Sequence, residues 1–179
     1  DEAEDIARKS RELNERILRR VKEMIDEDRD LNREIEKTLR RVSERNRELV
    51  EEIKREVERN REKREEVEKL IKRLDDELRR ILEELTRRLR ELEKKNEEVR
   101  REMEKLLKED RDRIRRAEEA GVEERIIEEL RRLTEDTKRR ADKLIKDSED
   151  ENRKTLRRAR ELIEENRDRN RKLEEDVRR

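Results

Sequence analysis

The sequence predicts an all-α protein, an elongated up-down-up three-helix bundle with nearly straight helices of about 57 residues each. Three observations predict this fold class. Residues that break helices are almost absent, apolar residues recur at the helical period, and polar residues within the apolar stripes align if the chain folds back twice. We expect residues 1–179 to form one domain.

Composition favours long helices over disorder. The 179 residues include no Pro, Cys, His, Phe, Trp or Tyr, and Gly121 is the single glycine. Charged residues make up 64% and apolar residues 27%, a balance that is typical of disordered chains. The 57 basic and 57 acidic residues cancel, however, so the chain does not repel itself as a polyanion would. With helical periodicity, such a composition is typical of long helices or coiled coils.

The first helix is predicted at about residues 2–59. Apolar side chains recur there at alternating steps of three and four residues from Ile6 to Val57. Polar residues hold the same step at the positions where an apolar residue is missing, namely Ser10, Asp28 and Asn46. This pattern places one apolar stripe along a single face of the helix.

The second helix is predicted at about residues 63–120 and the third at about 123–178. Apolar stripes run from Val67 to Ala117 and from Ile126 to Val177. The mean step is about 3.6 residues, the period of a straight α-helix. Three helices with two core positions in seven need roughly 49 apolar residues. The chain contains 48, which leaves few for a second apolar face and favours a monomer.

Two connections are predicted between these helices. Ala120-Gly121-Val122 is typical of a helix C-terminus with a left-handed glycine, and Glu123 and Glu124 place negative charge at the start of the next helix. The other turn is predicted at residues 60–63, where we expect Asn60 to take the left-handed conformation. Without that turn, a stalk with one unbroken helix through residue 120 would remain as an alternative.

Polar residues inside the stripes predict the register. Residues at one level of two antiparallel helices have position numbers that add to a constant. The constant 124 pairs Asn14 with Asp110, Asp28 with Asn96, and Thr38 with Thr86. The constant 244 continues two of these levels into the third helix, pairing Asp110 with Thr134 and Asn96 with Ser148, and Thr86 with Thr155 adds to 241. Asn46 lines up with Asn166 of the third helix but faces Leu78 of the second, so the rule does not hold at that level.

These aligned polar residues could line a cavity that binds a ligand, or they could bond to one another across the core. We expect the second, because an unsatisfied buried polar group costs about 1–3 kcal/mol. Asp28 and Asp110 most need a partner, since burying an unpaired carboxylate destabilises the folded chain. We expect each to reach solvent, an arginine or a neighbouring donor.

No catalytic, cofactor-binding or metal-ligating residue is predicted. Without His, Cys or Tyr, acid–base chemistry would depend on Asp, Glu, Lys and Ser, and no such group has the spacing of a dyad or triad. Basic runs such as 111–116 are flanked by acidic residues and lack aromatic residues that stack on bases. We therefore expect no small-molecule substrate, no nucleic acid and no membrane partner, and a soluble chain without a signal peptide or transmembrane segment.

The near-exclusive Glu/Arg/Lys surface, the Ile/Leu/Val stripes, the connector 119–123 and the polar stretch 147–156 together resemble computationally designed helical bundles with buried hydrogen-bond networks. The resemblance covers the whole chain, and it implies no natural substrate and recombinant production in a cytoplasm. The predicted function is a structural scaffold, monomeric and not an enzyme, whose core polar residues fix the helix register. The alternative is a coiled-coil-type interaction module that forms a homo- or hetero-oligomer.

Overall fold

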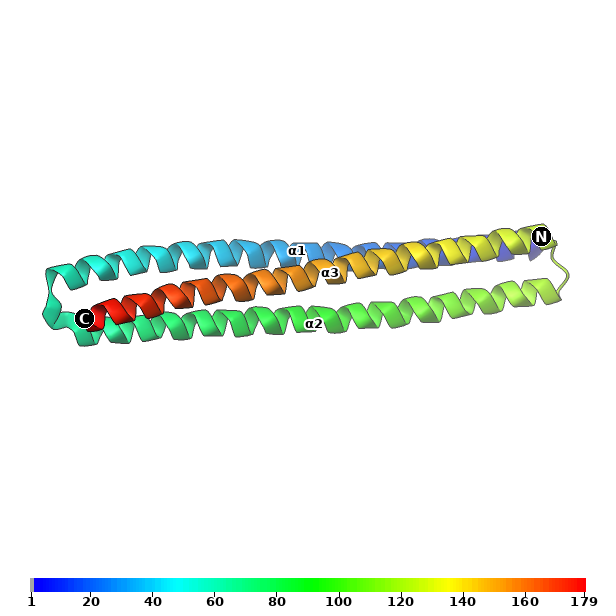
Figure 1. The fold of residues 1–179 in the computed structure, drawn as a ribbon. Helices are drawn as coiled ribbons and strands as arrows, with labels where there is room; N and C mark the ends of the chain where they lie inside the picture. The colour runs from blue at the N-terminus through cyan, green and yellow to red at the C-terminus, as the bar shows by residue number, and fades with distance from the viewer. Residues whose placement is uncertain (1) are drawn as a thin grey trace. The chain divides into compact units, whose positions relative to one another are not determined.

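A computed structural model describes residues 2–179 as three α-helices, shown in Figure 1. Helix α1 spans Glu2–Arg59, α2 spans Arg64–Glu119 and α3 spans Glu124–Arg178. A single 3₁₀ turn, η1, lies between α1 and α2 at Arg61–Lys63. The described residues contain no strand. The predicted fold class, an all-α three-helix bundle, is confirmed.

Each long helix begins with acidic and ends with basic side chains. The first turn contains Glu2, Glu4 and Asp5 in α1, Glu65 and Glu66 in α2, and Glu124 in α3. Arginine occupies all three last turns. This order opposes the helix dipole at both ends, which stabilises each terminus by about 0.3–1 kcal/mol.

The first connection lies where the sequence predicts it, but its geometry differs. Asn60 adopts φ −148° and ψ 98°, so the predicted left-handed conformation is wrong. The residue is an extended N-cap, and its side-chain oxygen accepts a hydrogen bond from the Glu62 amide at 3.2 Å. Asparagine suits both roles, and the cap is favoured here because it satisfies an amide that would otherwise lack a partner at the start of η1.

The second connection is a Schellman motif around Gly121, as the sequence predicts. Gly121 has φ 84°, and its amide donates to the Glu118 carbonyl at 3.2 Å. The Val122 amide donates to the Ala117 carbonyl at 3.1 Å, and both residues belong to one apolar cluster. The paired hydrogen bonds and the apolar contact define this motif and end α2. The Glu123 carbonyl then accepts the first amide bonds of α3.

We expect Gly121→Val to lower the free energy of unfolding by about 1–2 kcal/mol, because a β-branched residue is strained at positive φ. A Cβ added at Gly121 meets no atom within 4 Å, so the cost arises from the backbone alone. Chemical denaturation measures it. Ala120→Val is the matched control, one residue away at an exposed site with ordinary φ. Equal losses in the two variants would contradict the assigned role of Gly121.

The chain divides into two compact units. The first unit contains residues 2–29 and Glu91–Asp150, and therefore one segment of each helix together with the second connection. Its core consists of two apolar clusters. One is centred on Ile17, Val21 and Ile145, each at most 1% exposed. The other includes Ile114 and Ile127 and lies next to the second connection.

The second unit contains Asp30–Arg90 and Glu151–Arg179, again with one segment of each helix and with the first connection. Its larger apolar cluster is built around Ile35, Ala159 and Ile163, which are fully buried. A smaller cluster near the connection includes Ile71 and Val177. Each unit is thus a three-helix core of its own. That residues 1–179 form a single domain stays a prediction.

Candidate functional site

A polar layer crosses the core of the first unit with one side chain from each helix. Asp110 on α2 is fully buried, and its Oδ2 atom accepts hydrogen bonds from two neighbours. The Thr134 hydroxyl donates at 2.5 Å from α3, and the Asn14 amide donates at 3.3 Å from α1. The predicted pairing of these three residues is confirmed.

A second layer in the same unit repeats this chemistry with the carboxylate on a different helix. Asp28 on α1 is 1% exposed, and its Oδ2 atom accepts from Asn96 Nδ2 at 2.8 Å and from Ser148 Oγ at 2.6 Å. Both buried carboxylates thus receive neighbouring donors, which is one of the three outcomes predicted for them. Hydrogen bonds to a charged acceptor are about twice as strong as neutral ones, which offsets part of the desolvation cost.

In the second unit, asparagines bond between α1 and α3. Asn170 donates to Asn46 at 3.1 Å, and Asn46 donates to Asn166 at 3.5 Å, so the predicted alignment of Asn46 with Asn166 is confirmed. Asn166 also donates to Ser43 at 3.0 Å. A further bond, Asn32 to Asn152 at 3.0 Å, has no counterpart in the sequence prediction.

The threonines of the second unit do not bond to one another. Thr38, Thr86 and Thr155 each donate to the carbonyl four residues earlier in their own helix, at 2.8–3.0 Å. The predicted cross-helix bonding of Thr38 with Thr86, and of Thr86 with Thr155, is therefore wrong. A threonine hydroxyl has a single proton, and the local carbonyl is always within reach in a helix.

The layers are enclosed rather than open to a ligand. Asn14, Asn96, Thr134 and Asp110 are all at most 2% exposed, and the layer residues are spread over several levels. Several buried oxygen atoms among the described residues accept no hydrogen bond, including Asp110 Oδ1, Asn96 Oδ1 and Asn170 Oδ1. No substrate can reach either carboxylate without opening the core. The arrangement joins side chains of the three helices by hydrogen bonds inside the core.

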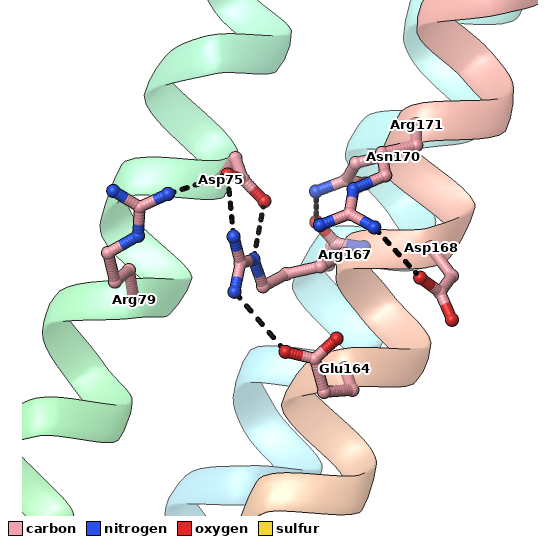
Figure 2. A network of polar contacts seen from close by, with 8 residues as sticks. Asp75, Arg79, Glu164, Arg167, Asp168, Asn170 and Arg171 are labelled. Carbon is pink, nitrogen blue, oxygen red and sulfur yellow. Dashed lines mark hydrogen bonds and ion pairs between the residues drawn. The ribbon is translucent and has the colours of Figure 1, made fainter.

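A second kind of polar contact lies at the edge of the core in the second unit, where Arg167 of α3 meets Asp75 of α2 (Figure 2). The guanidinium donates from Nε to Oδ1 at 2.9 Å and from a terminal nitrogen to Oδ2 at 3.4 Å. Their side chains are only 16% and 26% exposed. The hydrogen bond to Asp75 raises the pKa of Arg167 above its ordinary value, against the opposing effect of burial. The ion pair therefore links α2 to α3 at neutral pH.

No protein-family model matches the chain, and no curated protein matches it either. Among solved structures, the chain is similar to one described as a "Computationally designed three helix bundle". The two are 21% identical, the similarity covers 98% of this chain and 88% of that chain, and the TM-score is 0.45.

Within residues 2–179, no three acidic side chains gather in a way that could hold a metal ion. Over the same residues, no helix is long and apolar enough to cross a membrane.

Exposed ion pairs between helices give a small acid-dependent contribution to stability. Arg88 of α2 donates to both Glu34 oxygens of α1, at 2.9 and 3.1 Å, which lowers the pKa of Glu34 from its ordinary value. Because the pKa of Glu34 is lowered in the folded state, its ion pair stabilises the fold at pH values above the unfolded-state pKa of glutamate, about 4.3. That contribution is lost as the pH falls through the folded-state pKa.

We expect Glu34→Gln to be slightly less stable than the parent at pH 7, with a difference that shrinks to nothing in strong acid. Urea denaturation at a series of pH values measures this. Glu44→Gln, at an exposed site of the same helix with no ion pair, is the control and should match the parent at every pH. A difference for Glu34→Gln that persists unchanged in strong acid would contradict the assignment.

Proposed function

We propose that this chain is a structural scaffold of designed origin, a monomer with no enzymatic activity, whose intended property is its own fold. The observation that carries the proposal is the pair of polar layers in the first unit. Each layer takes one side chain from every helix and directs two donors onto one buried carboxylate oxygen. The same chemistry recurs with the carboxylate moved from α2 to α1.

In this proposal, the polar layers fix the helix register and the choice of partner helix. A leucine-rich stripe packs acceptably against any similar stripe, including that of a second copy, so apolar packing alone discriminates poorly. A wrong level or a wrong partner would leave Asp28 or Asp110 buried without its donors. Breaking a buried charged contact costs about 3–5 kcal/mol, which is enough to exclude such an arrangement.

Analytical ultracentrifugation tests the scaffold assignment. The scaffold requires a single species of 22.5 kDa across concentrations. A stable dimer or trimer would reject it and would favour the alternative, a coiled-coil-type module that acts by homo- or hetero-association.

A companion variant tests the polar layers. This variant keeps the core apolar and removes both layers. It replaces Asn14, Asp28, Asn96 and Asp110 with leucine, Ser148 with alanine and Thr134 with valine. We expect this variant to remain helical but to populate oligomers or several conformers, visible as extra sedimentation boundaries and extra amide signals by NMR. A variant that stays a single, uniquely folded monomer would show that the layers do not determine pairing.

A further inference from the structure

One groove on the second unit stands apart from the rest of the surface. It lies between α1 and α2 next to the first connection, and its volume is about 460 Å³. Helix α3 contributes no lining residue. The groove includes Leu70, which is 45% exposed and is the single large apolar side chain exposed in residues 2–179.

The lining residues form one stripe on each helix. On α1 the groove is lined at heptad spacing by Leu49, Glu52, Ile53 and Glu56. On α2 the lining continues over residues 66–77, through Glu66, Val67, Leu70, Leu74 and Glu77. Twelve residues of helix are about 18 Å long, and two stripes of this kind side by side form the seat that an added helix occupies in a four-helix bundle.

The rim of the groove is acidic. Four glutamates, Glu52, Glu56, Glu66 and Glu77, line it against the two cations Lys63 and Arg73. None of these glutamates forms an ion pair with another described residue, whereas their neighbours Glu51 and Asp75 do. A negative potential therefore remains over an apolar floor, and it attracts a cationic partner and repels an anionic one.

A groove on the first unit serves as a comparison. It lies between α1 and α3 and contains Arg8, which pairs with both Asp5 and Glu12. It contains no exposed large apolar side chain. Its charges are thus partly neutralised within the unit, and it lacks an apolar anchor comparable to Leu70.

We propose that the α1–α2 groove of the second unit is a docking site for a basic amphipathic helix. The apolar face of such a helix covers Leu70, Leu74 and Ile53, and its flanking lysines or arginines meet the four free glutamates. This is the helix-in-groove mode of recognition, with anchors at heptad spacing. A second copy of this chain is a poor occupant, because two such grooves face to face would oppose eight carboxylates, roughly, to half as many cations.

Fluorescence anisotropy with two labelled 21-residue peptides tests the site. Both have leucine at heptad positions a and d and alanine elsewhere, and they differ only in lysine or glutamate at the flanking positions. We expect the lysine peptide to bind with one-to-one saturation, with an affinity that falls at high salt, and the glutamate peptide not to bind. Equal binding of the two peptides, or binding of neither, would overturn the proposal.

Variants locate the binding on the chain. Glu52→Lys/Glu66→Lys should weaken the lysine peptide about tenfold and improve binding of the glutamate peptide. Leu70→Gln, at an exposed site, should weaken the lysine peptide by a similar factor of about ten without affecting the fold. The matched control is Glu58→Lys/Glu83→Lys, which changes the net charge equally on the opposite faces of the same two helices. If the control variant weakened binding as much as the groove variants, the effect would come from the net charge of the chain and not from the groove, and the site would be rejected.

The same sedimentation experiments test the competing occupant. If the chain alone formed a dimer that Leu70→Gln returned to 22.5 kDa, the groove would be a self-association surface and the peptide proposal would be wrong. A monomeric chain that binds the lysine peptide supports both the scaffold and the docking site.

Discussion

Asn96→Leu should lower the free energy of unfolding by about 2–3 kcal/mol, although it places a larger apolar residue in the core. Asn96 is 1% exposed, and its amide donates to Asp28 Oδ2 at 2.8 Å. Leucine removes that donor and leaves the carboxylate inside the core. Losing a hydrogen bond to a buried charge lowers the free energy of unfolding by more than the added apolar surface raises it.

Denaturation with guanidinium chloride measures the loss, and two further variants separate its causes. Asn170→Leu is an equally buried control whose partner, Asn46, is neutral, so its loss should be about 1 kcal/mol. Asp28→Leu/Asn96→Leu/Ser148→Ala removes the whole layer and should restore or exceed the parent's stability. If Asn96→Leu alone were as stable as the parent, the hydrogen bond to Asp28 would not contribute to the fold.

The levels of the core were predictable because helix geometry converts sequence position directly into height. Position numbers that add to 124 and 244 identified Asn14–Asp110–Thr134 and Asp28–Asn96–Ser148, and the structure confirms both layers. A second rule was available for the parallel pair α1 and α3, where matched residues differ by 120. It relates Asn46 to Asn166, and it would also have found the bond from Asn32 to Asn152.

Other features could not be predicted from position alone. The position number gives the height of a residue along the bundle but not the rotamer of its side chain. It therefore could not show that the Thr38 and Thr86 hydroxyls donate to carbonyls of their own helices. Asn60 follows the end of α1 as expected, but it is extended and caps a 3₁₀ turn instead of being left-handed, since the same side chain favours both conformations. The Arg167–Asp75 pair was hidden because arginine and acidic residues fill every exposed face, and only burial distinguishes this pair from the others.

The groove at Leu70 was missed for a related reason. The apolar stripe predicted for α2 runs through Val67, Ile71 and Leu74 and does not include Leu70, although Leu70 lies beside Ile71 in the sequence. In the structure Val67 is 3% exposed and Leu70 is 45% exposed, because three helices cannot cover the full width of that stripe. The width of an apolar stripe, more than its period, would have indicated an uncovered edge.

Burial also decides the second large effect, which we expect for Ile163→Ala. Ile163 is fully buried in the larger apolar cluster of the second unit, beside Ile35 and Leu39. Truncation to alanine removes apolar surface and leaves a cavity, and should cost about 3–4 kcal/mol in the free energy of unfolding. Ile163→Val should cost only about 1 kcal/mol, because one methyl group is lost.

Leu70→Ala is the informative comparison, since it also removes a large aliphatic side chain. Because Leu70 is already half exposed, its loss should stay below about 1 kcal/mol. Denaturant titrations of the three variants with a common unfolding slope give these differences directly. A loss of less than about 1 kcal/mol for Ile163→Ala would mean that the helices close over the cavity, and would contradict a tightly packed core in this unit.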